Sequence, residues 1–176
     1  MSSPALDDHA KAIGYLCMQF ALLEITMEQL IAHLVPIPNG KVSLILANAD
    51  IRGKQKMLRG LGHIHKPSTR WFEILDEQLR ALDGYILLRN RFIHDAWTTG
   101  PKFEPMRMER TTKIRRPQAH KPPELITNEN IPVTADEIWS LVQKVTHSSV
   151  QIGFLRAGLD LGEPDGLLPP LREKPK

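Results

Sequence analysis

The sequence predicts a mostly α-helical protein: a bundle of four to five helices with a small β-ribbon or basic loop inserted before the last long helix. Long segments carry apolar residues at every third or fourth position, whereas the segment from about 96 to 132 is rich in proline, threonine and basic residues. The chain has 176 residues, 41% of them hydrophobic, which suits one globular domain. We expect a single helical domain over 1–162 and a Pro-rich flexible tail over 163–176.

The first predicted helix runs from Leu6 to Val35. Pro36 predicts its end, because proline cannot continue a helix. A helix of this length spans about 45 Å, more than a small core requires, so we expect part of its surface to serve a partner. Its apolar residues alternate in steps of three and four, as in helices that pack against others: Ile13, Leu16, Phe20, Leu23, Met27, Leu30 and Leu34.

The region that follows contains one helix or two short ones over 42–61. Residues 48–50 are the expected break, and Gly60 or Gly62 is the expected stop. Residues 63–67 are expected to form a loop. Arg52, Lys54, Lys56 and Arg59 suit either a phosphate-binding face or, more commonly, a solvated helix surface.

A third long helix is predicted to begin at a Ser68 or Thr69 cap. Its apolar series is Phe72, Leu75, Leu79, Leu82, Ile86 and Ile93. Between Ile86 and Ile93, the spacing of three or four residues would place another apolar residue at position 89, which is occupied by Arg89.

The capping box formed by Thr134 and Glu137 predicts the start of the last helix. Between these two helices, the run 107–112 is a candidate strand of the ribbon. The apolar series of the last helix is Ile138, Leu141, Val145, Ile152, Leu155 and Leu159.

Positive charge is concentrated in one part of the chain. The whole chain carries a net charge of +3, but residues 102–122 hold seven basic residues against two acidic ones. Such clustering is typical of a surface that contacts phosphates. The basic residues are Lys102, Arg107, Arg110, Lys113, Arg115, Arg116 and Lys121.

Several function classes are disfavoured by composition. The single cysteine, Cys17, cannot form an internal disulfide or a cysteine zinc cluster, and we expect it to be a small buried hydrophobe. His63 and His65 resemble a metal-binding pair, but no cysteine or acidic cluster lies near them in sequence, so we expect no metal and no cofactor. No uninterrupted apolar run approaches the roughly 18 residues of a membrane span, and the N-terminus lacks signal-peptide features. We expect a soluble, cytoplasmic protein without a membrane partner.

Residues 88–97 place an unusual group of polar side chains at the end of an otherwise apolar helix. At 100° per residue, Asn90 and His94 lie about 40° apart on the helix surface, and Arg91 lies about 60° from His94. These three side chains share a face. Arg89 points about 140° away from it.

This segment resembles the HEPN superfamily of helical-bundle proteins. The family signature is an arginine separated from a histidine by four to six residues, which Arg89 and His94 match, with Asn90 as the polar residue that the family prefers after the arginine. The aromatic residue after the histidine and the basic hairpin are also similar to members with a small sheet between their last helices. The helix order is comparable over roughly residues 6–160. Asp95 departs from the pattern, since many relatives have glycine there.

The resemblance implies a metal-independent endoribonuclease, in which the ribose 2′-OH attacks the adjacent phosphate to leave a 2′,3′-cyclic phosphate. Arg89, Asn90 and His94 would be its catalytic residues. His94 would transfer a proton and Arg89 would stabilise charge on phosphorus. The family also implies a site formed across a homodimer, and a role as a toxin or defence component with an antitoxin partner protein. Arg91 and the basic segment, represented by Arg110, Arg115 and Arg116, would bind the RNA substrate.

Other interpretations remain open from the sequence. One is a catalytically silent helical homodimer that binds RNA or a protein partner, which the carboxylate of Asp95 slightly favours; alternatively, that carboxylate would raise the pKa of His94. Another is purely structural: Arg89 would form a buried ion pair with Glu24 or Glu28, and His94 would cap its helix.

Overall fold

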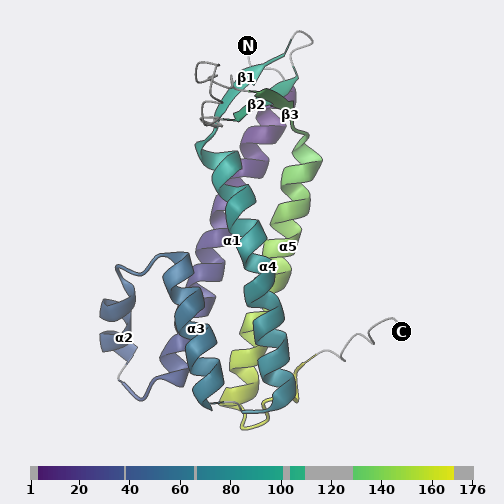
Figure 1. The fold of residues 1–176 in the computed structure, drawn as a ribbon. Coiled ribbons are helices and arrows are strands. Elements are labelled where there is room, and N and C mark those ends of the chain that lie inside the picture. The colour runs from purple at the N-terminus through teal and green to yellow at the C-terminus, as the bar shows by residue number, and fades with distance from the viewer. Residues whose placement is uncertain (1–3, 38, 66, 101–103, 110–128, 169–176) are drawn as a thin grey trace, which may run out of the picture. The chain divides into compact units, whose positions relative to one another are not determined.

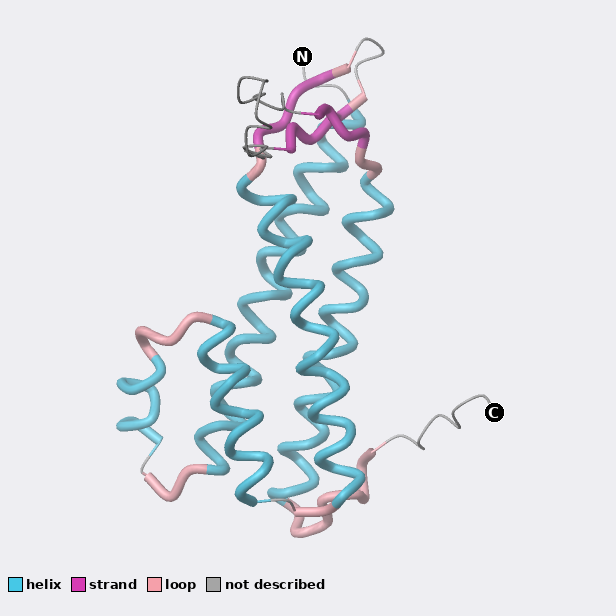
Figure 2. Tube along the Cα trace, viewed as in Figure 1, coloured by secondary structure: helices cyan, strands magenta, loops and turns pink. Residues whose placement is uncertain are grey.

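The fold class predicted from the sequence is confirmed by the computed structural model, which describes residues 4–37, 39–65, 67–100, 104–109 and 129–168. Within these ranges, helices dominate and three short strands form one sheet before the last long helix (Figures 1 and 2). The elements are α1 (Pro4–Leu34), α2 (Asn39–Leu46), α3 (Ile51–His65), α4 (Thr69–His94), β1 (Ala96–Thr99), β2 (Pro105–Glu109), β3 (Glu129–Pro132) and α5 (Ala135–Asp160).

The chain divides into two compact units, and the three long helices each contribute to both. Unit 1 comprises Met1–Leu16 and Ile86–Val142, and therefore holds the sheet and the end of α4. Unit 2 comprises Cys17–Tyr85 and Gln143–Lys176, and holds α2, α3 and most of α4.

The apolar series predicted for the long helices form the cores of the units. In α1, six of the seven residues are buried and Ile13 is half-buried, and the helix ends two residues before Pro36. In α5, every residue of the predicted series except the half-buried Leu159 is buried. In α4, the four middle residues of the predicted series are buried, which confirms them. The two end positions are wrong, because Trp71 and Phe92 are buried where Phe72 and Ile93 are only half-buried.

Residues 6–34 of α1 are long enough to cross a membrane, and the most apolar 18 consecutive residues among them have a mean hydropathy of 1.2, which is high enough for a membrane-spanning helix. Polar residues interrupt this helix, which explains why the sequence contains no continuous apolar run. Core helices of soluble proteins have the same length and composition, so these properties of α1 fit both kinds of helix.

The break predicted between the second and third helical segments is confirmed, but the predicted stop is wrong. Helix α3 continues past Gly60 and Gly62 to His65, through most of the region that we expected to be a loop. Gly62 is buried, and a Cβ atom at this position would lie 2.9 Å from the Leu75 side chain of α4. This glycine therefore permits the close approach of two helices instead of ending one.

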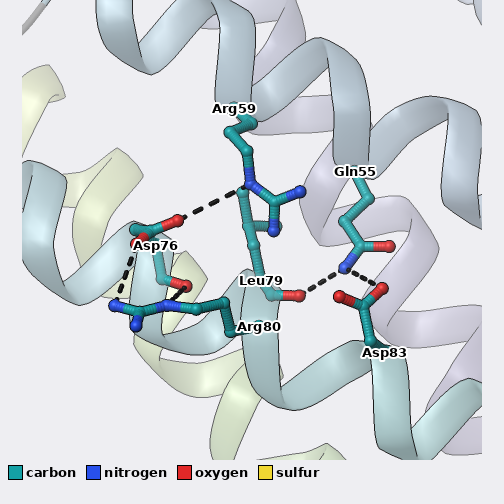
Figure 3. Close-up of polar contacts among 6 residues, drawn as sticks. All are labelled: Gln55, Arg59, Asp76, Leu79, Arg80 and Asp83. Atoms are coloured by element: carbon teal, nitrogen blue, oxygen red, sulfur yellow. Dashed lines mark hydrogen bonds and ion pairs between the residues drawn. The ribbon is translucent and has the colours of Figure 1, made fainter.

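Polar contacts join α3 to α4 beside this close approach (Figure 3). The buried amide of Gln55 donates to the backbone carbonyl of Leu79 and, at 3.0 Å, to Asp83. Arg59 lies 3.6 Å from the carboxylate of Asp76. Gln55 and Arg59 of α3 are thus both paired with groups on one face of α4.

Lys54 is a buried cation held between two glutamates of α1. Its ammonium lies 2.7 Å from Glu24 and 2.8 Å from Glu28. Burial lowers the pKa of Lys54, but the hydrogen bonds and charges of the two glutamates outweigh this effect and raise the pKa above its ordinary value of 10.5. The expectation that Lys54 lies on a phosphate-binding or solvated face is wrong, because its charge is neutralised inside unit 2.

Replacing Lys54 with methionine should lower the free energy of unfolding by about 2 kcal/mol at about pH 8, since the two glutamates would then repel each other without a cation. The pKa of Lys54 is higher in the folded protein than in the unfolded chain, where it has its ordinary value of 10.5. The contacts of the Lys54 ammonium therefore stabilise the fold fully below pH 10.5. That stabilisation is lost as the pH rises through the folded-state value. Urea unfolding of wild type and Lys54→Met from about pH 8 to about pH 11.5 should show the difference shrinking at the alkaline end. A constant difference would contradict this role.

The sheet of unit 1 is an antiparallel meander in the order β1-β2-β3. Thr98 of β1 pairs with Met106 of β2, which pairs in turn with Pro132 of β3. The sheet confirms the β alternative for the 96–132 insertion. Its central strand begins at Pro105, two residues before the predicted run.

Both predicted helix caps are present. Ser68 Oγ accepts a hydrogen bond of 2.9 Å from the backbone amide of Trp71, which caps α4. At α5, Thr134 Oγ1 accepts from the Glu137 amide while the Glu137 carboxylate accepts from the Thr134 amide, a complete capping box.

The first part of the Pro-rich tail contacts α4 within unit 2. Ser68 donates a hydrogen bond of 2.5 Å to Asp165, and Arg70 donates to the carbonyl of Leu168, whose side chain is buried. Residues 169–176 of the predicted flexible tail lie outside the described residues.

Candidate functional site at the end of α4

The residues of the motif lie in the last two turns of α4, which ends at His94. Asn90 and His94 are exposed, and their i, i+4 spacing places them on one face of the helix. Arg91 is half-buried beside them. The structure therefore presents an amide and an imidazole together at an accessible helix end.

Arg89 is half-buried, and its guanidinium turns toward that same face. Its Nη1 donates a hydrogen bond of 3.1 Å to Oδ1 of Asn90. The side chains of Arg89 and His94 leave the helix axis in directions about 140° apart, but the Arg89 side chain is long enough for its guanidinium to reach the amide of Asn90. Arg89 and Asn90 thus form a directly bonded pair, one turn before His94.

Asp95 binds Arg107 of β2. Its carboxylate accepts a hydrogen bond from the Arg107 guanidinium, and the side chains are 18% and 6% exposed, respectively. This ion pair attaches the end of α4 to the central strand of the sheet. Asp95, which departs from the HEPN pattern, therefore has a structural role.

A second contact fixes the end of α4 to β1. The indole of Trp97 donates a hydrogen bond of 2.9 Å to the carbonyl of Phe92, one of the carbonyls left without a partner at a helix end. Trp97 also makes an edge contact with the ring of His9 in α1, with a centroid distance of 6.0 Å. His9 is buried, and its Nε2 lies 2.7 Å from the Val133 carbonyl, so this nitrogen carries the donated proton.

Sequence reasoning missed His9 and gave Arg107 the wrong place. His9 lies 124 residues from its partner Val133, and a lone histidine in an amphipathic helix gives no sign of such a contact. We counted Arg107 in the basic segment, but it is buried in an ion pair and is not available to RNA phosphates. Three of the four residues assigned to substrate binding, Arg110, Arg115 and Arg116, lie outside the described residues, and the fourth is Arg91.

The acidic partners considered for Arg89 have another role, because Glu24 and Glu28 both bind Lys54. The expected burial of Cys17 is also wrong, since this residue is exposed.

His63 and His65 lie in the last turn of α3, two positions apart, so their side chains do not face each other. The ring of His63 instead lies 4.5 Å from that of Phe72. Within the described ranges, the structure contains no cluster of three or more histidine, cysteine or acidic residues that could hold a metal ion.

The helix end combines groups suited to chemistry on a phosphodiester. A guanidinium binds phosphate oxygens through paired donors, and an imidazole accepts or donates a proton near neutral pH. Asn90 accepts a hydrogen bond from the guanidinium of Arg89. The Asp95–Arg107 pair and the Trp97–Phe92 bond hold the turn that carries His94.

Comparison of the chain with protein-family models, curated proteins and solved structures found no match.

Proposed function

We propose that the protein is a HEPN-like, metal-independent endoribonuclease whose active site includes Arg89, Asn90 and His94. The observation that carries this proposal is the arrangement at the end of α4: a guanidinium bonded to Asn90, with His94 exposed on the face that carries Asn90. The enzyme acts in the cytoplasm as a toxin or defence component, and an antitoxin protein restrains it.

In this mechanism, His94 takes the proton from the attacking 2′-OH or gives one to the leaving 5′-oxygen. Attack by the 2′-oxygen forms a new P–O bond, and the bond to the 5′-oxygen breaks to leave a 2′,3′-cyclic phosphate. Arg89 stabilises the negative charge on the non-bridging oxygens, and Arg91 binds an adjacent phosphate. Asn90 holds the guanidinium in place.

The active site is shared between two protomers. This arrangement is what the HEPN resemblance implies: a second copy of α4, related by a two-fold axis, completes the site so that Arg89 of one protomer acts with His94 of the other. Leu87 and Leu88, next to the motif, are 50% and 38% exposed, which supports an apolar contact at this end of α4.

Mixing two inactive variants tests this shared site. We expect Arg89→Gln and His94→Ala each to be inactive, and an exchanged mixture to recover about one quarter of wild-type activity. About half of the dimers then contain one copy of each variant. In such a mixed dimer, one of the two sites combines the intact Arg89 of one protomer with the intact His94 of the other, and the second site lacks both. Sedimentation analysis and exchange of a fluorescent label must show that mixed dimers form. No recovery after confirmed exchange would contradict a shared site.

A second function, the silent homodimer that binds RNA or a protein, has support from the same exposed leucines, which suit an interface without any catalysis. Asp95 no longer favours it, because the ion pair with Arg107 gives a structural reason for a carboxylate at this position. RNA binding without cleavage by the wild-type protein would favour this alternative.

For the basic segment, we expect Arg115→Ala with Arg116→Ala to weaken RNA binding regardless of sequence and to reduce the slope of log K against log salt by about 1–2. Each phosphate contact releases counterions when it forms, so its loss lowers that slope. Binding measured at several salt concentrations checks this result. An unchanged affinity and slope would show that this segment does not contact RNA.

A further inference from the structure

Residues from the C-terminal part of α1, from α2 and from α3 line an apolar groove in unit 2. Figure 1 shows where these three helices lie in the fold. Its volume is about 330 Å³. Among the described residues, only apolar surface lines it, including Ile31 of α1, Ile45 of α2, and Met57, Gly60, Leu61 and Ile64 of α3. An occupant must therefore present apolar atoms to it.

The groove leaves large apolar side chains in contact with solvent. Ile45 is 58% exposed and Ile64 is 76% exposed, and Met57 between them is also exposed. Single exposed apolar residues are common on protein surfaces, but a set that lines one concave surface marks an interaction site.

The part of the groove's rim that α2 and α3 form is basic. Residues 39–65 contain five lysines and arginines against one acidic residue, Asp50, whose carboxylate accepts a hydrogen bond from the Gly53 amide. Lys54 and Arg59 pair with acids inside unit 2, whereas Lys41, Arg52 and Lys56 are exposed.

Two of these exposed cations stand directly beside the lining. Lys41 is the i, i+4 neighbour of Ile45, and Lys56 is the i, i+4 neighbour of Gly60. The charge of the rim therefore selects an occupant with acidic groups flanking its apolar side.

The length of the groove fits an α-helix. Its α3 lining runs from Met57 to Ile64, two helical turns or about 10 Å. Three apolar anchors at positions i, i+3 or i+4, and i+7 of a bound helix cover the same distance. A lipid acyl chain is longer, about 15 Å, since it crosses half of the hydrocarbon layer.

We propose that this groove binds an amphipathic helix of a partner protein that carries acidic residues beside its apolar face. The proposal does not depend on RNA cleavage, because it uses only residues of unit 2.

Gly60 offers a substitution that fills the groove without disturbing the fold. It is exposed, and a Cβ atom at this position meets nothing within 4 Å, so Gly60→Gln places a polar side chain in the apolar groove. Gly84 of α4 is also exposed in a helix with nothing within 4 Å of an added Cβ, and it does not line the groove. Gly84→Gln is the matched control, since both changes also improve helix propensity.

The test selects binders of the full chain from a displayed pool of helical peptides of about 18 residues, with three apolar anchors fixed and flanking positions randomised. We expect the selected peptides to be acidic. Their affinity should fall at least tenfold for Gly60→Gln, remain unchanged for Gly84→Gln, and fall when lysines replace the acidic residues. Enrichment of no peptide, or of peptides insensitive to Gly60→Gln, would overturn the proposal. So would binding to vesicles of anionic phosphatidylglycerol that Gly60→Gln abolishes, because the groove would then be a membrane contact.

Discussion

His94→Ala should reduce RNA cleavage by about 10² to 10⁴-fold while the protein remains folded. A positioned proton-transfer group contributes a factor of this size. His94 is exposed at the last position of α4, so removing its ring takes nothing from the core. Initial rates on a labelled RNA, with circular dichroism and thermal unfolding of the same samples, measure both parts of this expectation.

His147→Ala is a suitable control for the His94 experiment, because His147 is also exposed on a helix and lies outside the proposed site. It should keep full activity. A purely structural His94 that caps the C-terminus of α4 would produce a different pattern. Its loss would cost about 1 kcal/mol of stability, and cleavage would not change.

Arg107→Ala should lower the free energy of unfolding by about 3 kcal/mol. The substitution leaves the carboxylate of Asp95, which is 18% exposed, without its cation, and loss of one partner of a buried ion pair costs about 3–5 kcal/mol. We expect a loss at the low end of this range because Asp95 is partly exposed to solvent. Denaturant unfolding monitored by tryptophan fluorescence provides the measurement.

A double-mutant cycle separates this ion pair from other effects of Arg107. Adding Asp95→Ala to Arg107→Ala should recover part of the lost stability, because no carboxylate then remains without a partner. Additive losses in the double variant would show that the two side chains do not interact. Arg107→Ala alone with a loss below about 0.5 kcal/mol would place this arginine among ordinary surface residues.

The fold was largely predictable because the long helices bury regularly spaced apolar residues, and this spacing is a local property of the sequence. The series from Leu16 to Leu34 in α1 and the capping box at Thr134 are examples. The end of α3 was not predictable in the same way. Gly62 permits contact with Leu75, which is 13 residues away and belongs to another helix, so its role depends on tertiary packing.

The candidate site shows the same division between local and long-range information. The spacing of Arg89, Asn90 and His94 on one helix could be read from the sequence, as could the shared face of the last two. The contacts that hold this end of α4 in place could not be predicted, since the ion pair between Asp95 and Arg107 connects it to β2. Lys54 belongs to the same category, because its glutamate partners lie about 30 residues earlier in the chain.

The most direct test of the proposed ribonuclease is the chemistry of its products in the presence of excess EDTA. Purified wild-type protein should cleave single-stranded RNA under these conditions, and the upstream fragments should end in a 2′,3′-cyclic phosphate. His94→Ala protein purified in the same way should yield about 10² to 10⁴-fold less of these fragments. Cleavage that EDTA abolishes, fragments with a 3′-hydroxyl end, or equal cleavage by the two preparations would contradict the proposed function.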